Sequence, residues 1–244
     1  MTKKRLDLCV MELRGFSRAY AHEVIAAGLV SVDGRAVLKP GMMTSLESVK
    51  ILAPDMPYVS RGGLKLAAAL EYFGIRLEGL VCLDVGASTG GFTDCMLKAG
   101  ARQVYAVDVG HGQLADALRK DPRVTSHENT DIRDFALPAP ADFAACDLSF
   151  ISLGKVLPAI GRLVAPGGGL ICLIKPQFET GGRHLSKRGV VRDKAARALA
   201  VARIEGVIQD NGFELVGTVE SPLTGRDGNV EYLAYGDRKG RSHE

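Results

Sequence analysis

The chain has 244 residues, of which 46% are hydrophobic and 24% are charged, and its formal net charge is +3 at pH 7. This profile predicts a globular protein with one large core and room for a small second domain. No run approaches the ~18 apolar residues of a membrane-spanning helix and no leader core follows the first basic residues, so we expect a cytoplasmic protein without a membrane partner. Five cysteines without a C-x-x-C pair predict free thiols and no metal site.

Residues 1–53 predict a small α+β module. Ser17 can cap a second helix that Gly28 would end, and Asp33-Gly34 between alternating apolar residues is typical of a β-hairpin turn. The predicted elements are two helices, a hairpin and a last strand, at 5–11, 18–27, 29–37 and 49–52.

Basic residues near the predicted turns of this module suit contacts with phosphates. On composition alone, a solvated surface with scattered charges is the simpler interpretation. However, R-L-D at 5–7, S-R at 17–18, I-x-x-G-x-V-x-V-D-G at 25–34 and K-P-G at 39–41 closely resemble the RNA-binding domain of the ribosomal protein S-four type. The resemblance implies RNA binding and makes residues 54–57 a linker. The residues that would contact RNA are Arg5, Arg14, Ser17, Arg18, Arg35 and Lys39.

Residues 58–244 predict a doubly wound, Rossmann-like α/β domain. Apolar runs of strand length alternate with helical patterns after a first helix at 64–73, which favours a parallel sheet with helices on both faces. A late pair of strands, at 213–219 and 231–235, predicts a terminal hairpin. The predicted central strands are 80–85, 103–108, 123–127, 142–147 and 169–174, and the predicted helices are 92–99, 112–120, 152–164 and 193–211.

The stretch from Leu80 to Asp94, LVCLDVGASTGGFTD, predicts a strand, a glycine-rich turn and a helix that together bind a ligand. A dinucleotide fingerprint has glycine where this turn has Ser88, and Asp84 at the strand end would repel a pyrophosphate but suits a cationic amino group. Asp108 ends the next apolar run, where a ribose-binding acid is expected. S-adenosylmethionine is therefore the favoured ligand, with a nucleotide or a purely structural turn as alternatives. The candidate donor-binding residues are Asp84, Gly86, Ser88, Gly90, Gly91, Phe92, Asp108, Asp131 and Asp147.

An irregular loop at 177–192 is rich in glycine and basic residues. It is either a solvated loop or a lid that contacts phosphates. Together with Arg61, the loop residues Arg183, Lys187 and Arg188 are candidates for RNA contact.

Four charged residues lie where they can serve chemistry. Asp147 and Lys175 each follow an apolar strand run, Glu231 begins the last strand, and Lys65 is on the helix before the first strand. Each could be an ordinary edge charge. Because central strand ends converge on one crevice of a doubly wound sheet, the set together indicates proton abstraction from a weak acid followed by methyl transfer.

Five motifs extend this interpretation: S-R-G-G-L-K at 60–65, D-V-G-A-S-T-G-G-F at 84–92, D-L-S-F at 147–150, I-K-P-Q-F-E at 174–179 and N-V-E-Y at 229–232. They resemble the FtsJ-type ribose 2′-O-methyltransferases, and the combination with the first module is similar to the TlyA family, often labelled hemolysin A. The departures are small: Thr89 stands where the FtsJ-type loop has Pro, and Phe92 where it has Trp.

The resemblance implies cytidine 2′-O-methylation of ribosomal RNA, free or in ribosomal subunits, with S-adenosylmethionine as donor and no metal. It carries a catalytic tetrad onto Lys65, Asp147, Lys175 and Glu231. We expect Lys175, held by Asp147 and Glu231, to take the proton of the ribose hydroxyl, and Lys65 to steady the developing alkoxide. Two alternatives remain: an RNA-binding protein that has lost catalysis, and a pore-forming hemolysin, against which the lack of a membrane-length segment argues.

Overall fold

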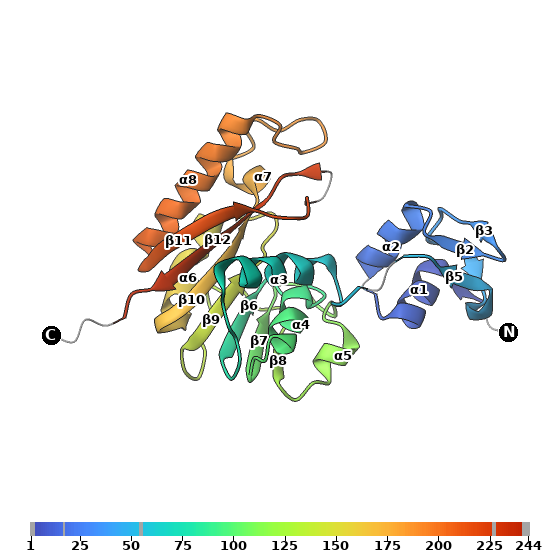
Figure 1. The fold of residues 1–244 in the computed structure, drawn as a ribbon, viewed down its shortest axis with the longest axis horizontal. Helices are drawn as coiled ribbons and strands as arrows, with labels where there is room; N and C mark the ends of the chain where they lie inside the picture. The colour runs from blue at the N-terminus through green and yellow to red at the C-terminus, as the bar shows by residue number, and fades with distance from the viewer. Residues whose placement is uncertain (1–2, 17, 54–55, 226–227, 241–244) are drawn as a thin grey trace. The chain divides into compact units, whose positions relative to one another are not determined.

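The computed structural model describes residues 3–16, 18–53, 56–225 and 228–240. The chain divides into two compact units, Met1–Arg61 and Gly62–Glu244, and each has its own hydrophobic core. In Figure 1 the colour of the ribbon runs along the chain from the first unit, in blue, into the second.

The first unit is a small α+β module whose core lies between its helices and a three-stranded sheet. The sheet is antiparallel with the order β3-β2-β5, and β1 pairs separately with β4. In chain order the elements are β1 (Lys4–Arg5), α1 (Leu6–Arg14), α2 (Arg18–Ala26), β2 (Val30–Val32), β3 (Arg35–Ala36), β4 (Met43–Thr44), the 3-10 helix η1 (Leu46–Ser48) and β5 (Val49–Ile51).

The predicted hairpin is confirmed. Val32 pairs with Arg35 across Asp33 and Gly34, whose φ angles of 50° and 78° are the positive values that a type I′ turn requires. The first helix begins at Leu6 rather than at Arg5, because Arg5 pairs with Met43 as the end of β1. The predicted capping residue Ser17 lies outside the described residues.

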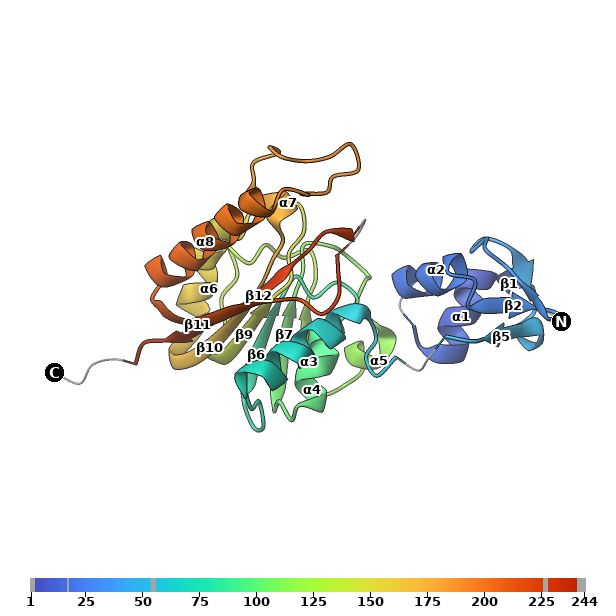
Figure 2. The ribbon, with the colours of Figure 1, turned by 45° about the horizontal axis from the view of Figure 1, so that its top comes forward.

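The second unit is a doubly wound α/β domain, as the sequence predicts. Its seven strands have the order β11-β12-β10-β9-β6-β7-β8. Figure 2 shows α3 and α4 on one face of the sheet and α6 and α8 on the other. Strands and helices alternate as β6 (Val81–Val85), α4 (Gly91–Lys98), β7 (Gln103–Val107), α5 (Asp116–Arg119), β8 (Val124–His127), β9 (Ala141–Cys146), η2 (Leu153–Lys155), α6 (Leu157–Leu163), β10 (Val164–Ile174), α7 (Pro176–Glu179), α8 (Lys194–Asp210), β11 (Phe213–Glu220) and β12 (Tyr232–Arg238), after α3 (Arg61–Phe73).

The sheet is mixed rather than wholly parallel. β12 pairs with β10 and with β11, and both pairings are antiparallel, which confirms the predicted late strand pair. In the β10–β12 ladder Ile174 is opposite Tyr232. The neighbouring residues Lys175 and Glu231 therefore flank the same end of this ladder, which is how a residue near the C-terminus reaches the centre of the sheet.

Two predicted helices are shorter than expected. The helix expected at 112–120 is reduced to α5, because the side chain of Glu128 binds the backbone N–H groups of Gly112, Gln113 and Leu114. The helix expected at 152–164 is divided into η2 and α6, with Pro158 in the first turn of α6, where its missing N–H costs no hydrogen bond. No helix within the described ranges is long and apolar enough to cross a membrane.

Candidate functional site

The glycine-rich turn between β6 and α4 is shaped by close contact with the end of β9. Gly86 has a φ of 85°, and a Cβ placed there would lie 2.6 Å from the backbone oxygen of Asp147. Ser88 also has a positive φ, 48°, and Gly90 has a φ of 93°. Only glycine fits at position 86, so the turn lies directly against the segment that carries Asp147.

Asp84 is a buried carboxyl group with one unsatisfied oxygen. It is fully buried, and its Oδ2 accepts a 2.6 Å hydrogen bond from the Thr93 hydroxyl. Its Oδ1 has no hydrogen-bond partner among the described residues. Burial, with smaller contributions from the nearby Asp147 and Asp108 carboxylates, raises the pKa of Asp84 to about 7. A cationic ligand group that reached Oδ1 would remove this penalty, which fits the ammonium of S-adenosylmethionine.

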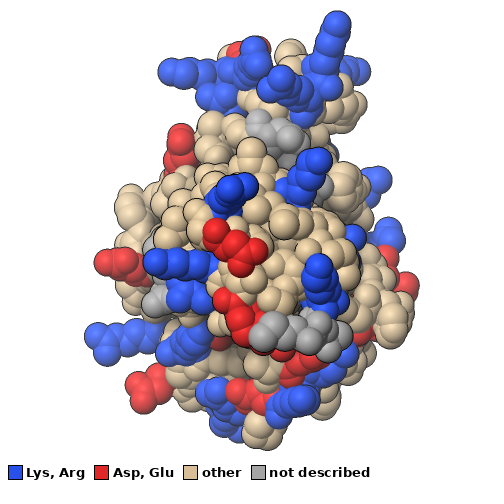
Figure 3. Space-filling model, turned by 90° about the vertical axis from the view of Figure 1, so that its right-hand side faces the viewer, with Lys and Arg blue, Asp and Glu red and all other residues tan. Residues whose placement is uncertain are grey.

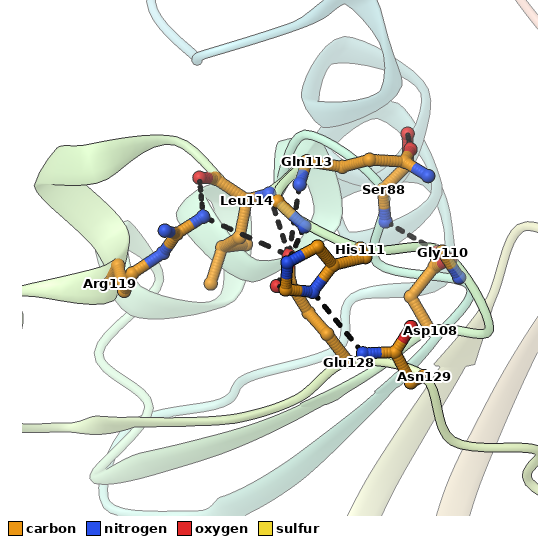
Figure 4. A network of polar contacts seen from close by, with 10 residues as sticks. Ser88, Asp108, Gly110, His111, Gln113, Leu114, Arg119, Glu128 and Asn129 are labelled. Carbon is orange, nitrogen blue, oxygen red and sulfur yellow. Dashed lines mark hydrogen bonds and ion pairs between the residues drawn. The ribbon is translucent and has the colours of Figure 1, made fainter.

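Asp108 lies at the start of the loop that faces this turn. Its Oδ2 accepts the backbone N–H of Ser88 at 2.8 Å, and its Oδ1 accepts that of Gly110 at 2.7 Å (Figure 4). The Ser88 hydroxyl in turn donates to the side-chain oxygen of Gln113 at 3.0 Å. Asp108 therefore ties the glycine turn to the loop at 109–115.

Glu128 is a residue of this region that the sequence interpretation missed. Its carboxylate accepts three consecutive backbone N–H groups, from Gly112, Gln113 and Leu114, at 2.8 to 3.3 Å. These hydrogen bonds, that of Gly112 first, lower the pKa of Glu128. Figure 4 shows the carboxylate surrounded by this loop, with Arg119 3.8 Å away. The only signal in the sequence is an acid directly after a strand, which is too common to be informative.

A cavity opens where β6 and β7 end, beside the glycine turn. Several predicted donor residues line it, and Leu148 and Ser149 from the segment after β9 form another part of its wall. The predicted donor residues that are not among the described lining are Asp84, Ser88, Gly90, Gly91, Phe92 and Asp147. Of these, Asp84 and Phe92 are buried, with 0% and 3% exposure. The residues that line the cavity include Gly86, Asp108, Asp131, Leu148, Ser149 and Ile151.

Asp131 faces the cavity but is already engaged. Its carboxylate accepts from the Arg133 guanidinium, with the closest N–O distance 2.5 Å. These hydrogen bonds hold the pKa of Asp131 at about 2. Asp131 is therefore ionised and oriented by Arg133 at neutral pH.

The four predicted catalytic residues form two ion pairs. Lys175 Nζ lies 2.6 Å from Asp147 Oδ1 and 2.9 Å from the Ser149 hydroxyl. Lys65 Nζ lies 2.5 Å from Glu231 Oε2, and both of these side chains are buried. Among the described contacts Glu231 pairs with Lys65 and not with Lys175. The expectation that Glu231 also holds Lys175 is therefore wrong for these contacts, because α3 brings the ammonium of Lys65 to that carboxylate.

Backbone packing fixes Glu231 further. A Cβ at Gly225 would lie 1.9 Å from Glu231 Oε1, so the loop between β11 and β12 presses on this carboxylate. Asn229, two residues before Glu231, links this loop to the basic segment: its amide donates to the oxygen of Gly189, and its oxygen accepts the N–H of Val191. The exposed candidates Arg183, Lys187 and Arg188 therefore belong to a segment that is tied to the Glu231 loop.

In the first unit, two arginines and a histidine gather on one buried carboxylate. Asp7 is fully buried and accepts from Arg5 at 2.9 and 3.0 Å, from Arg18 at 3.2 Å and from His22 at 2.9 Å. The hydrogen bonds from Arg5, followed by those from His22 and Arg18, hold the pKa of Asp7 well below its usual range. The side chains of Arg5, Arg18 and His22 remain about half exposed.

The other basic candidates are spread over the surface. Arg14 donates to the backbone oxygen of Ala53 at 2.8 Å, and Arg35 and Lys39 are exposed. Figure 3 shows Lys and Arg side chains on one face in separate groups, with acidic side chains between some of them. Within the described ranges there is no cluster of three or more His, Cys, Asp or Glu side chains that could hold a metal ion.

Comparisons with known proteins show which family the chain belongs to. Residues 58–238 match the family described as FtsJ-like methyltransferase. The chain is 44% identical over 224 residues to the 16S/23S rRNA (cytidine-2′-O)-methyltransferase TlyA of Mycobacterium tuberculosis, covering 90% of this chain and 84% of that protein. It is 41% identical over 225 residues to Hemolysin A of Brachyspira hyodysenteriae, covering 90% of this chain and 93% of that protein.

The solved structure of a hemolysin candidate from Streptococcus thermophilus is similar to this chain over nearly its whole length. It shares 40% identity at a TM-score of 0.77 and covers 98% of this chain and 90% of that one. The family match covers well over half of the chain, and S-adenosylmethionine is the cofactor that goes with it. The chain belongs to the FtsJ-like methyltransferase family.

Proposed function

We propose that this protein transfers a methyl group from S-adenosylmethionine to the ribose 2′-hydroxyl of a cytidine in ribosomal RNA, in the cytoplasm. The observation that carries the proposal is the Lys175–Asp147 pair, 2.6 Å apart, at strand ends directly against the glycine turn of Asp84. The named relative of Mycobacterium tuberculosis supports the substrate.

The donor supplies a methyl group on a positively charged sulfur. Asp84 and Asp108 orient the donor through its ammonium and ribose, and Lys175 stands on the acceptor side. In the proposed reaction Lys175 acts as the neutral amine, which requires that its ammonium first release a proton to solvent. The ribose O–H bond would then break with its proton going to Lys175 Nζ, and the oxygen would take the methyl group of the donor as the carbon–sulfur bond breaks with its electron pair leaving on sulfur. Placing the two reactants ~3 Å apart is the largest contribution, and base assistance adds about 10²–10⁴-fold.

Lys65 and Glu231 hold the far side of the acceptor position in this proposal. Both side chains are buried and form a close ion pair, so neither moves freely. A paired ammonium in this position adds positive potential for the developing alkoxide without itself giving up a proton. Breaking the pair would leave a buried charge without its partner, which is costly.

RNA contacts come from both units in this proposal. Arg5, Arg18 and His22 present half-exposed donors that Asp7 holds in place, which suits the phosphates of an RNA backbone. Phe150 follows Asp147 by three residues in the sequence, and its side chain is 86% exposed. An exposed aromatic ring near a reacting ribose suits stacking on an unpaired base.

The test is to methylate ribosomal subunits from cells that lack the gene, using the purified protein and isotopically labelled S-adenosylmethionine. Nucleosides from the digested RNA are then separated by mass spectrometry. We expect labelled 2′-O-methylcytidine with the wild-type protein and none with Lys175→Ala. Label in a base methyl group, or none in RNA, would contradict the proposal.

A further inference from the structure

The carboxylate of Glu179 is buried in the second unit, and the mechanism above does not use it. It lies at the end of α7 with 4% exposure, and the described ion pairs include none that involves Glu179. A carboxylate in this position is costly unless its oxygens are well hydrogen-bonded. Its contacts therefore show what it holds.

Each oxygen of Glu179 binds the start of η2. Oε2 accepts from the Ser152 hydroxyl at 2.6 Å, and Oε1 accepts from the backbone N–H of Leu153 at 2.8 Å. Ser152 Oγ also accepts the N–H of Gly154 at 3.2 Å, so it caps η2. Hydrogen bonds to an ionised acceptor are about twice as strong as neutral ones, which makes this a firm connection.

These contacts join the two segments that carry the catalytic pair. α7 follows directly after Lys175, and η2 is reached from β9 through the residues that begin with Asp147. At the strand ends, Lys175 contacts Asp147 and Ser149; at the other end, Glu179 holds Ser152 and Leu153. The segment 147–153 is therefore fastened to the 175–179 segment at both ends.

The middle of this segment is in a conformation that needs support. Phe150 has a φ of 65°, unusual for a bulky residue, and its ring lies 5.2 Å from that of Phe178. Leu148, Ser149 and Ile151 line the donor cavity on the same segment. A strained backbone persists only where its surroundings hold it, and the Glu179 contacts lie immediately after the strained residue.

We propose that Glu179 is a positioning residue for methyl transfer: by fixing the 147–153 segment, it keeps Asp147 and Ser149 in contact with Lys175. It acts through that segment, with its own oxygens bound to Ser152 and Leu153 rather than facing the donor. The catalytic consequence rests on the proposed function, whereas the anchoring itself does not.

The experiment compares Glu179→Gln and Ser152→Ala with Glu214→Gln, which removes an exposed carboxylate on β11. Glutamine keeps the size of Glu179 but loses the charge and one acceptor, and Ser152→Ala removes one partner with less risk to folding. Each full-length protein is measured for single-turnover methyl transfer at saturating donor and RNA, donor affinity by calorimetry, thermal unfolding, and hydrogen exchange of peptides that cover 147–155.

For Glu179→Gln we expect the single-turnover rate to fall about 10- to 100-fold, because small displacements of reacting groups have effects of this size. The donor dissociation constant should change less than about threefold, and Ser152→Ala should show a smaller loss of the same kind. Hydrogen exchange at 147–155 should increase in both variants and not in Glu214→Gln.

Two results would overturn the inference. One is unchanged hydrogen exchange at 147–155 in Glu179→Gln, which can be read even if the wild-type protein does not methylate RNA. The other is an unchanged single-turnover rate at saturating donor together with weaker donor binding, since Glu179 would then affect binding alone. Absence of turnover in the wild-type protein would contradict the proposed function and leave the anchoring to be decided by exchange.

Discussion

Asp7 in the first unit and Asp84 in the second are both fully buried, yet their surroundings are opposite. Asp7 accepts from Arg5, Arg18 and His22, which hold its pKa well below the usual range. Asp84 has only the Thr93 hydroxyl and backbone as described partners, and burial raises its pKa to about 7.

The protein itself supplies hydrogen-bond donors for the carboxylate of Asp7, whereas one oxygen of Asp84 has no described partner and is available to a ligand. Asp7 uses its charge to hold cations in place, so its effect on function passes through Arg5 and Arg18. Asp84 keeps an acceptor without a described partner next to the glycine turn. We therefore expect the two residues to control different binding steps, which substitutions at the two positions and changes of pH can test.

The largest expected effect is on donor binding. Asp84→Asn should weaken S-adenosylmethionine binding by about 10- to 100-fold, because a charged contact worth ~1.5–3 kcal/mol is lost. Calorimetry on the full-length protein measures this, with Asp116→Asn as a surface control. Unchanged donor affinity in Asp84→Asn would mean that the unsatisfied oxygen has no part in binding.

The second expected effect is on RNA affinity. Asp7→Asn should weaken ribosomal RNA binding about tenfold, because Arg5, Arg18 and His22 lose the charge that orients them. Asp33→Asn removes the same charge from the turn of the same unit and serves as the matched control. Simple charge counting predicts tighter binding in both variants, so tighter RNA binding by Asp7→Asn would refute the positioning role.

The third prediction concerns pH. Because Asp84 has a raised pKa, it must lose a proton before it can pair with the donor ammonium, which is still protonated between pH 5.5 and 7. Donor binding should therefore tighten by about 15-fold over this range and release protons. Calorimetry in buffers of different ionisation enthalpy measures both quantities, and a flat profile in the wild-type protein would be inconsistent with this origin.

The smallest expected effect is on stability without ligand. A raised pKa means that folded Asp84 holds its proton where the unfolded chain has lost it, so this group costs stability as pH rises from about 4 through 7. Asp84→Asn should therefore raise the unfolding temperature of the ligand-free protein by about 2–4 °C at pH 8 and leave it nearly unchanged at pH 4. Thermal scans at the two pH values test the sign, and a lower unfolding temperature at pH 8 would contradict it.

The sequence predicts most of the second unit because strand runs, glycines and acids occur in a strict order there. Asp84 is the penultimate residue of β6, and Asp108, Asp147 and Lys175 directly follow β7, β9 and β10. Strand ends of a doubly wound sheet meet at one edge. The loop at 109–115 is different: its residues have a helical pattern, but Glu128, more than a dozen residues later, captures its N–H groups. No local pattern reveals a contact of that kind.

The pairing of the four catalytic candidates also needed the structure. Their residue types indicate two cations and two carboxylates, but not which cation meets which carboxylate. Lys65 reaches Glu231 because α3 packs near the antiparallel β12, where the rings of Phe73 and Tyr235 are 5.3 Å apart. The direction of β12 depends on the whole strand order. The contacts of Glu179 could not be predicted for a similar reason, because its partners Ser152 and Leu153 have no distinctive sequence pattern.

In the proposed mechanism, Lys175 receives the proton of the ribose hydroxyl. This role is tested by single-turnover methyl transfer at saturating donor and RNA for Lys175→Arg, with Lys155→Arg, on an exposed lysine, as the control. A guanidinium keeps the charge but cannot deprotonate in this pH range, so we expect Lys175→Arg to lose at least about 10²-fold in rate while Lys155→Arg keeps the wild-type rate. If Lys175→Arg retained most of the wild-type rate, Lys175 would be only a positioning charge, and the proton would have to go elsewhere.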